Sequence, residues 1–413
     1  MNKFYIIKEF YLKYAFYFLP LLIILGNAYI NFFFVSVVFL YFISCIIEKK
    51  IISYENDEFK FFLLFYIYLI LNSFLAEDLK SSFLRSIPYL KFFIFILIFQ
   101  ELIEKKKINL KNLGYVWLSI IFILSLDIIY QSIVGHDFFN YVSDYKTRNS
   151  GFFFDELVAG GFLVSFAPIS IFLLFKEKQN LLIYFLFIFF LLVIFLSGER
   201  ANLIDFIIIS FCVYFFCFKS KLIFKFFSII LLCLTLIFML SNLDNFKDRY
   251  FSTISFSKNQ NLNLIQTYFT SEYGSHALSS VFMLKDNLLF GVGNKNFRIV
   301  CNQYKDKVIE FQKKIDKTER DIYPHGCGTH PHQIYYELLS EHGLIGFMII
   351  IFLIFKLIFK NFSIKNNLNF VCFIYIILYF IPILPSGSFF STLPSTFFWI
   401  NYLFYIVNIR KYD

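Results

Sequence analysis

The residues best suited to catalysis lie in segment 324–346, PHGCGTHPHQIYYELLSEHGLIG, where histidine, proline and glycine precede a helical pattern. Pro331 suits the first turn of a helix, so the pattern predicts that His332 lies in that turn. A helix N-terminus disfavours an imidazolium and offers free N–H groups. His332 is therefore predicted to stay neutral and to act as a general base beside an anion site. The alternative is that His330 and His332 only cap and solvate the turn.

A second candidate, Arg200, lies at the junction of two apolar runs, next to Glu199 and shortly before Asp205. Ionisable groups at such a depth are costly unless they line a cavity or bind a charged ligand. A guanidinium offers two parallel donors to a phosphate, which favours a phosphorylated lipid as the ligand of Arg200. The alternative is an ion pair of Arg200 with Glu199 or Asp205 that stabilises the hairpin.

Two other polar motifs have a structural interpretation. Asp127 and Gln131 lie one helical turn apart near the end of another apolar run. This spacing favours interhelical hydrogen bonds, with support of the active site as the alternative. The short motif Gly291-Val292-Gly293 lacks the rest of a nucleotide-binding sequence, so it is predicted to shape a loop.

The composition indicates that a membrane bundle carries these residues. Of 413 residues, 59% are hydrophobic and 23% are aromatic, which excludes an ordinary soluble protein. The net charge of +9 is typical of lysine-rich cytoplasmic loops, so nucleic-acid binding is disfavoured. Apolar runs long enough to cross a bilayer recur about twelve times. They lie at residues 14–30, 31–47, 59–75, 84–103, 112–133, 157–175, 181–197, 202–218, 222–241, 338–359, 367–384 and 395–409.

The short loops between these runs differ in charge. Alternate loops carry roughly twenty lysines and arginines, and the intervening loops carry about six. The positive-inside rule then places both termini in the cytoplasm and the long polar segment 242–337 outside. The expected fold is an all-α polytopic membrane protein with about twelve transmembrane helices and one large periplasmic loop between the ninth and tenth. Its regions are 1–110 (N-terminal helices), 111–241 (central helices), 242–337 (periplasmic loop) and 338–413 (C-terminal helices).

The cysteines agree with this topology. Cys301 and Cys327 alone lie in the predicted outer loop, and the other five lie in apolar runs. In an oxidising periplasm the two would close a loop of about 26 residues, worth on the order of 3 kcal/mol. A zinc site with His325, His330 and His332 is the weaker alternative, because two thiols need further ligands.

Together these motifs resemble those of the O-antigen ligases and the related O-antigen polymerases. The most specific similarity is the pattern H-Q-x9-G-x-x-G, which begins at His332 and Gln333. The other similar segments are Leu289–Gly293 with Phe297, the hairpin Ser197–Ala201, and Asp127–Gln131 with Gly135 and Asp137. The resemblance covers roughly residues 115–350.

The resemblance implies a metal-independent, inverting glycosyltransferase of lipopolysaccharide biosynthesis in the bacterial inner membrane, without a cofactor. The donor would be a glycan on undecaprenyl pyrophosphate, and the acceptor a sugar hydroxyl of lipid A-core, both at the periplasmic face. The catalytic histidine of the family corresponds to His332, and the hairpin arginine to Arg200. His330, Gln333, Asp127 and Asp205 would support them.

The family usually has a second arginine for the pyrophosphate in its large loop. The corresponding stretch here reads Gly274-Ser275-His276. His276 is therefore the expected replacement, and Arg249 or Arg298 are alternative sources of the charge. This departure leaves the second anion-binding residue open.

Two other functions remain as alternatives. A polymerase would join repeat units on the lipid carrier by the same reaction, and the H-Q-x9-G-x-x-G pattern favours the ligase over it. In a transporter of polysaccharide or lipid-linked sugar, Asp127, Arg200 and Asp205 would line the path of the substrate through the membrane. The polar residues instead gather at the outer ends of the predicted helices, and no inverted repeat is visible in the sequence.

Overall fold

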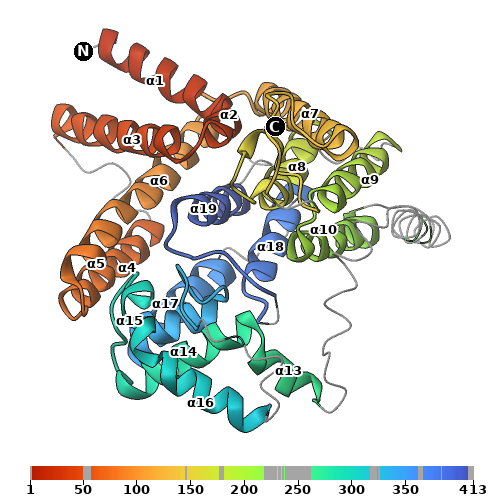
Figure 1. The fold of residues 1–413 in the computed structure, drawn as a ribbon. Helices are drawn as coiled ribbons and strands as arrows, with labels where there is room; N and C mark the ends of the chain where they lie inside the picture. Colours follow the sequence, from red (N-terminus) through yellow and green to blue (C-terminus); the bar gives the residue numbers. More distant parts are fainter. Residues whose placement is uncertain are drawn as a thin grey trace.

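The computed structural model describes residues 2–49, 57–144, 147–175, 181–217, 262–316, 326–360, 366–382 and 384–407, together with residues 230, 234, 237 and 323. Every regular element in these ranges is a helix (Figure 1). The all-α class expected from the sequence is therefore confirmed for the described part of the chain.

The N-terminal helices pack around a core rich in phenylalanine. They are α1 (Asn2–Tyr17), α2 (Leu19–Ile24), α3 (Asn27–Glu48), α4 (Asp57–Phe74), α5 (Leu79–Ser86) and α6 (Leu90–Glu104). The predicted span 14–30 is wrong as one continuous helix, because it breaks after Tyr17 and again at Gly26, whose φ is 105°. Pro20 near the start of α2 lacks the N–H that a continuous helix would use.

The central helices form the next layers of the bundle. They are α7 (Leu110–Val134), α8 (Ala159–Phe175), α9 (Leu181–Leu196) and α10 (Arg200–Cys212), which continues as a π-helical turn over Val213–Cys217. Side chains at the starts of several helices accept hydrogen bonds from the first turn, as expected of N-caps. These caps include Asp78 before α5, Asn109 before α7 and Asn366 before α18.

The polar region after α10 folds into a small group of helices with its own core. It contains α13 (Leu264–Thr270), α14 (Glu272–Asp286), α15 (Phe297–Val300) and α16 (Lys305–Ile315). Its core is formed by Met283, Val292, Phe297, Val300 and Tyr304 with Cys301. Cys301 and Cys327 are joined by a disulfide, as the sequence predicts. The disulfide leaves neither sulfur as a thiolate ligand for zinc.

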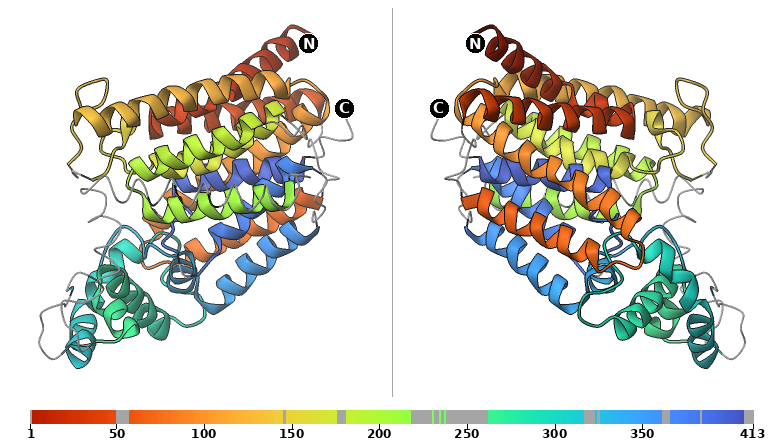
Figure 2. Two further views of the ribbon diagram at one scale, coloured as in Figure 1. Left: turned by 90° about the vertical axis from the view of Figure 1, so that its right-hand side faces the viewer. Right: turned by 90° about the vertical axis from the view of Figure 1, so that its left-hand side faces the viewer.

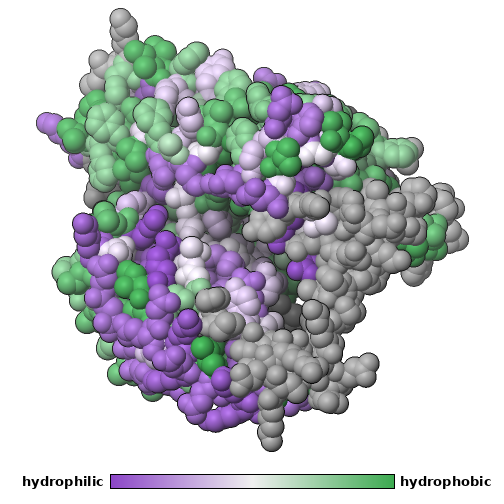
Figure 3. Space-filling view, viewed as in Figure 1, coloured by the Kyte–Doolittle hydropathy of each residue, from purple (hydrophilic) through white to green (hydrophobic). Residues whose placement is uncertain are grey.

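The chain returns to the bundle through α17 (Ile334–Lys360), α18 (Asn367–Tyr379) and α19 (Thr392–Ile406). The long apolar helices run side by side (Figure 2). The start of α1 and the end of α19 lie at one end of this bundle, and α13–α16 lie at the other (Figure 2). Hydrophilic side chains gather over α14–α16, whereas hydrophobic ones predominate over α1–α3 (Figure 3).

The lengths and composition of the helices support a multi-pass membrane protein. Within the described residues, five segments are long and apolar enough to cross a membrane: Asn27–Glu48, Leu79–Glu104, Leu110–Val134, Arg200–Cys217 and Ile334–Phe359. Shorter apolar helices cover Ala159–Phe175, Leu182–Leu196 and Asn367–Tyr379. The predicted span 222–241 lies almost entirely outside the described residues. The predicted total of about twelve helices therefore stays a prediction.

Candidate active site

Three histidines meet between α14 and the segment that leads into α17. The ring centroid of His332 lies 4.1 Å from that of His330 and 5.3 Å from that of His276. The rings of His276 and His332 are nearly parallel, at 29°. Tyr273 lies edge-on to His332 at 5.7 Å. His276, His330 and His332, which come from different parts of the sequence, thus form one histidine cluster.

Buried serines hold the segment before α17 against α14. The hydroxyl of Ser275 donates to the carbonyl of Tyr323 at 2.7 Å, and the hydroxyl of Ser279 donates to the carbonyl of Gly326 at 2.5 Å. The disulfide anchors the same segment to the small helical core. These contacts fix the backbone from which the histidines of the cluster project.

His332 lies before α17 and not in its first turn, so the predicted helical position is wrong. The helix begins at Ile334, and His332 has a φ of 58°. The reason is that Gln333 starts the helix: its Oε1 accepts hydrogen bonds from the backbone N–H groups of Tyr335 at 2.7 Å and Tyr336 at 3.2 Å. Ser386 N donates to the carbonyl of His332 at 2.9 Å, which stabilises the left-handed backbone.

Burial, and not a helix terminus, keeps the histidine cluster neutral. Burial lowers the pKa of His332, and the neighbouring His276 lowers it further, while Glu272 acts in the opposite direction. Burial also lowers the pKa of His276, again opposed by Glu272. The pKa of His330 is strongly lowered by burial and by the proximity of His332. A neutral imidazole is therefore available at neutral pH to accept a proton.

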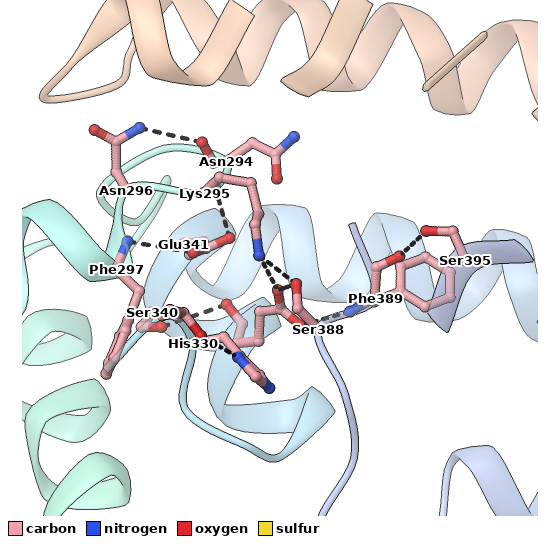
Figure 4. Close-up of polar contacts among 12 residues, drawn as sticks. Asn294, Lys295, Asn296, Phe297, His330, Ser340, Glu341, Ser388, Phe389 and Ser395 are labelled. Carbon is pink, nitrogen blue, oxygen red and sulfur yellow. Dashed lines mark hydrogen bonds and ion pairs between the residues drawn. The ribbon is translucent and has the colours of Figure 1, made fainter. Parts of the chain in front are cut away.

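A buried ion pair includes Lys295, whose charge acts on His330 of the histidine cluster (Figure 4). The Nζ of Lys295 lies 3.4 Å from Oε1 of Glu337, and the two side chains are 2% and 1% exposed. Lys295 Nζ donates to the hydroxyl of Ser388, which donates to Glu337. Phe389 N donates to the second oxygen of Glu337 at 2.8 Å. The pair thus fastens the loop around Lys295 and the segment 384–391 to the start of α17.

Glu341, one turn further along α17, holds the same loop. Its carboxylate accepts hydrogen bonds from the backbone N–H groups of Lys295 at 2.7 Å and Phe297 at 3.2 Å. Sequence reasoning missed Lys295, Glu337 and Glu341. The available signal was two carboxylates four residues apart at the start of an apolar helix, where charges are costly and usually have a partner.

The glycines of the family-like motif bring this loop and α17 into backbone contact. Gly291 and Gly343 have φ values of 68° and 63°. A Cβ on Gly343 would lie 2.5 Å from the backbone of Leu289, and a Cβ on Gly291 would lie 2.5 Å from the backbone of Glu341. The N–H of Gly293 donates to the carbonyl of Glu341 at 2.8 Å. The prediction that this motif shapes a loop agrees with these contacts.

Arg200 is the first residue of α10 and is half-buried. Its neighbour Glu199 accepts hydrogen bonds from Gly160 N at 2.7 Å and from the side-chain amide of Asn202 at 2.6 Å. Glu199 therefore holds the hairpin to α8 and α10. The predicted interaction of Arg200 with a phosphate stays a proposal.

A cavity of about 200 Å³ lies beside this hairpin. Its polar lining includes Glu199, Asn202, Asp205, Tyr379 and Ser386. The Oδ1 atom of Asp205 is buried and meets no hydrogen-bond partner in the part of the chain that the structure describes. Because the N–H of Ser386 donates to the carbonyl of His332, the segment 384–391 joins this hairpin cavity to the histidine cluster.

Asp127 and Gln131 bind loop backbone and not a neighbouring helix. The carboxylate of Asp127 accepts from Phe138 N at 2.8 Å, and the amide oxygen of Gln131 accepts from Gly151 N at 2.9 Å. Both residues are buried. The favoured interpretation of interhelical hydrogen bonds is thus replaced by a role in holding Phe138 and Gly151, which lie between α7 and α8, against the end of α7.

The remaining predicted site residues are Arg298, Arg249 and His325. Arg298 is exposed on α15, and among the described residues no hydrogen bond, ion pair or ring contact joins it to the histidine cluster. Arg249 and His325 lie outside the described residues.

A comparison with known protein families gives a match over part of the chain. Residues 185–351 match the family model described as O-antigen ligase. The match supports the O-antigen ligase and polymerase family, and it includes the hairpin, the small helical region and the histidine cluster. No curated protein matches the chain.

Proposed function

With residues 185–351 in the O-antigen ligase and polymerase family, we propose that this chain is an O-antigen ligase that transfers a glycan from undecaprenyl pyrophosphate to a hydroxyl of lipid A-core. The transfer takes place at the periplasmic face of the bacterial inner membrane. The observation that carries the proposal is the link through Ser386 between the hairpin cavity, which is lined by Glu199 and Ala201 on either side of Arg200, and the histidine cluster. This link supports a transfer in which His332 acts as the base next to a donor diphosphate that Arg200 binds at the hairpin.

In the proposed reaction the acceptor oxygen attacks the anomeric carbon of the donor. A new carbon–oxygen bond forms as the bond to the diphosphate breaks, so a single displacement inverts the configuration. His332 accepts the proton of the attacking hydroxyl, and the diphosphate leaves with the electron pair. Arg200 stabilises the charge of the leaving group, which makes the transfer independent of a metal ion.

His276 is assigned to the second diphosphate contact. Its Nδ1 is buried and has no hydrogen-bond partner among the described residues, and its ring stacks on His332. A neutral imidazole still donates one N–H, so His276 suits the place of the arginine that the family usually has there. The exposed Arg298 has no comparable contact with His332.

The test uses Arg200→Lys, which keeps the charge and loses the planar pair of donors. Transfer from lipid-linked donor to lipid A-core is measured in membranes with matched protein levels. Arg200→Lys should lose most of the transfer, whereas Arg298→Lys, on an exposed surface, should retain it. Full activity of Arg200→Lys would remove bidentate recognition from the mechanism.

The products distinguish the ligase from the polymerase. A ligase deletion should leave lipid A-core without polysaccharide while lipid-linked polymer accumulates. Attachment of single repeat units would instead indicate a polymerase, and failure of the lipid-linked glycan to reach the periplasm would indicate a transporter.

A further inference from the structure

A second cavity, larger than the one beside Arg200, lies between α3, α5 and α6. Its volume is about 500 Å³, within the roughly 300–1,000 Å³ of ligand pockets in proteins. Its polar lining includes Asn31, Arg85 and Lys91. Phe390 and Thr392, from the C-terminal part of the chain, also line it. None of the residues assigned to the transfer reaction lines this cavity.

Lys91 is a buried cation. It is only 8% exposed, and its Nζ donates to the side-chain oxygen of Asn31 at 2.6 Å. The rings of Phe34 and Phe92 lie 5.7 Å and 5.0 Å from the same nitrogen. In the described part of the chain, no ion pair joins Lys91 to a carboxylate. A buried charge in an apolar helix without a counter-charge indicates a ligand of opposite sign.

Arg85 adds a second positive charge to the same cavity. It lies in the last turn of α5, and the short 3-10 turn Ile87–Tyr89 separates α5 from α6. This turn lets Arg85 and Lys91 line one cavity although they belong to different helices. A guanidinium and an ammonium facing a shared space are suited to a phosphate, which accepts hydrogen bonds from both and neutralises their repulsion.

The rim of the cavity indicates that the phosphate belongs to a lipid. Val35, Leu84 and Ile87 line the cavity and are 61%, 64% and 51% exposed. All three lie on the apolar helical segments Asn27–Glu48 and Leu79–Glu104 that are suited to cross the membrane. Acyl chains would therefore lie against this rim while the phosphate contacts the cations.

The cavity is connected to the histidine cluster through the segment 384–391. The hydroxyl of Tyr89, in the lining, donates to the carbonyl of Phe389 at 3.4 Å. A few residues earlier, Ser386 contacts His332 and lines the cavity beside Arg200. The same segment thus borders two cavities and the proposed base, an arrangement suited to two lipid substrates that meet at His332.

We propose that the α3–α5–α6 cavity binds the phosphate of the acceptor glycolipid, with Arg85 and Lys91 as its ligands. This inference deepens the proposed function, since it rests on that function for the identity of the lipid as the acceptor. The donor diphosphate is then held by Arg200 at the hairpin, and the acceptor hydroxyl approaches His332 from the opposite side of the segment 384–391.

The experiment measures binding directly with the purified full chain in detergent. The probes are lipid A carrying its phosphates, the same lipid after enzymatic dephosphorylation, phosphatidylglycerol and inorganic phosphate. The variants are Arg85→Gln, Lys91→Gln and the control Lys80→Gln, which removes an exposed charge at the start of α5 outside the cavity lining. Lys91 is buried, so Lys91→Gln could disturb folding. Arg85→Gln changes an exposed side chain, so its result tests the site even if Lys91→Gln does not fold.

Phosphorylated lipid A should bind, and the dephosphorylated lipid should bind about tenfold or more weakly, as expected for lost hydrogen bonds to a charged group. Arg85→Gln and Lys91→Gln should each weaken binding about tenfold, and Lys80→Gln should not. Unchanged affinity of Arg85→Gln would overturn the proposal. Equal binding of phosphatidylglycerol, or competition by inorganic phosphate at the same concentration, would overturn its assignment to the acceptor glycolipid.

Transfer assays separate this inference from the proposed function. Arg85→Gln should raise the KM for the acceptor about tenfold while leaving kcat and the KM for the donor nearly unchanged. If His332→Gln abolishes transfer while Arg85→Gln has normal acceptor KM and binding, only the inference fails. If wild-type chain transfers nothing while Arg85→Gln still loses lipid A binding, the proposed function fails and the phosphate site remains.

Discussion

At the residue scale, His332 and His330 give an internal control for the proposed base. Their ring centroids are 4.1 Å apart, so both belong to the same cluster and each can be changed separately. His332→Gln keeps a hydrogen-bonding group but cannot take the proton at neutral pH, and transfer should fall by about 10²–10⁴-fold. His330→Ala should cost less. Transfer from lipid-linked donor in membranes with matched protein levels measures both, and substantial turnover by His332→Gln would exclude it as the base.

The acid limb of the pH–rate profile tests the neutral state of the cluster. Because burial lowers the pKa of His332 and of His276 below the ordinary histidine value of 6.5, the active, deprotonated form should persist below that pH. The limb of kcat/KM should therefore be centred on the acid side of pH 6.5.

A change at Glu272 tests the direction in which the acid limb of this profile should move. Its carboxylate raises the pKa of both His332 and His276. Glu272→Gln removes that charge, so the acid limb should move to still lower pH, measured with the same donor and acceptor. A limb above pH 6.5 in the wild type, or a shift to higher pH in Glu272→Gln, would contradict the electrostatic account.

At the scale of elements, the contact between α17 and the loop 288–293 depends on two glycines. Gly343 has φ 63° and ψ −170° inside α17, a region that is nearly restricted to glycine. Gly343→Ala would also place its Cβ 2.5 Å from the backbone of Leu289. We expect a large fall in Tm and loss of transfer, because the displaced loop carries Lys295 away from Glu337.

Gly135→Ala is the matched control for this change. Gly135 also has a positive φ, 93°, but a Cβ there would meet no atom within 4 Å. The substitution should cost only the backbone strain, about 1–2 kcal/mol. Thermal unfolding of both variants in detergent measures the difference. Equal shifts in Tm would show that backbone conformation alone, and not the contact with Leu289, makes Gly343 necessary.

The sequence predicted the helical class, the disulfide and the residues of the histidine cluster, because these depend on composition and local motifs. It placed His332 wrongly in a helix. The preference of Pro331 for a first helical turn is outweighed by the side chain of Gln333, which caps the helix one residue after His332. It did not predict the pairing of Lys295 with Glu337. These residues are 42 positions apart, and only the folded loop brings them together, so no local pattern records their contact.

At the scale of the whole molecule, the two ends of the bundle carry different parts of the chain. The start of α1 and the end of α19 lie at one end and α13–α16 at the other (Figure 2). The segment 384–391 contacts the start of α17, and it borders both cavities. A substrate lipid can therefore keep its acyl chains beside the apolar helices while its polar group reaches the histidine cluster. The proposed function, with its periplasmic donor, requires that α13–α16 lie in the periplasm.

Two exposed lysines test this orientation. Lys105 follows α6 and Lys314 lies on α16, and their side chains are 63% and 71% exposed. Each pairs with a glutamate one turn earlier, Glu101 or Glu310. Cysteines at the two positions should therefore react at similar rates once both are accessible to the reagent.

The lysine distribution predicts that Lys105 faces the cytoplasm and Lys314 the periplasm. A membrane-impermeant thiol reagent that reaches the periplasm of intact cells should then label Lys314→Cys and not Lys105→Cys, and both should be labelled after lysis. The wild-type chain, with its native cysteines, gives the background. Labelling of Lys105→Cys alone in intact cells would mean that the protein has the opposite orientation in the membrane. The histidine cluster would then face the cytoplasm, where a periplasmic glycan donor could not reach it.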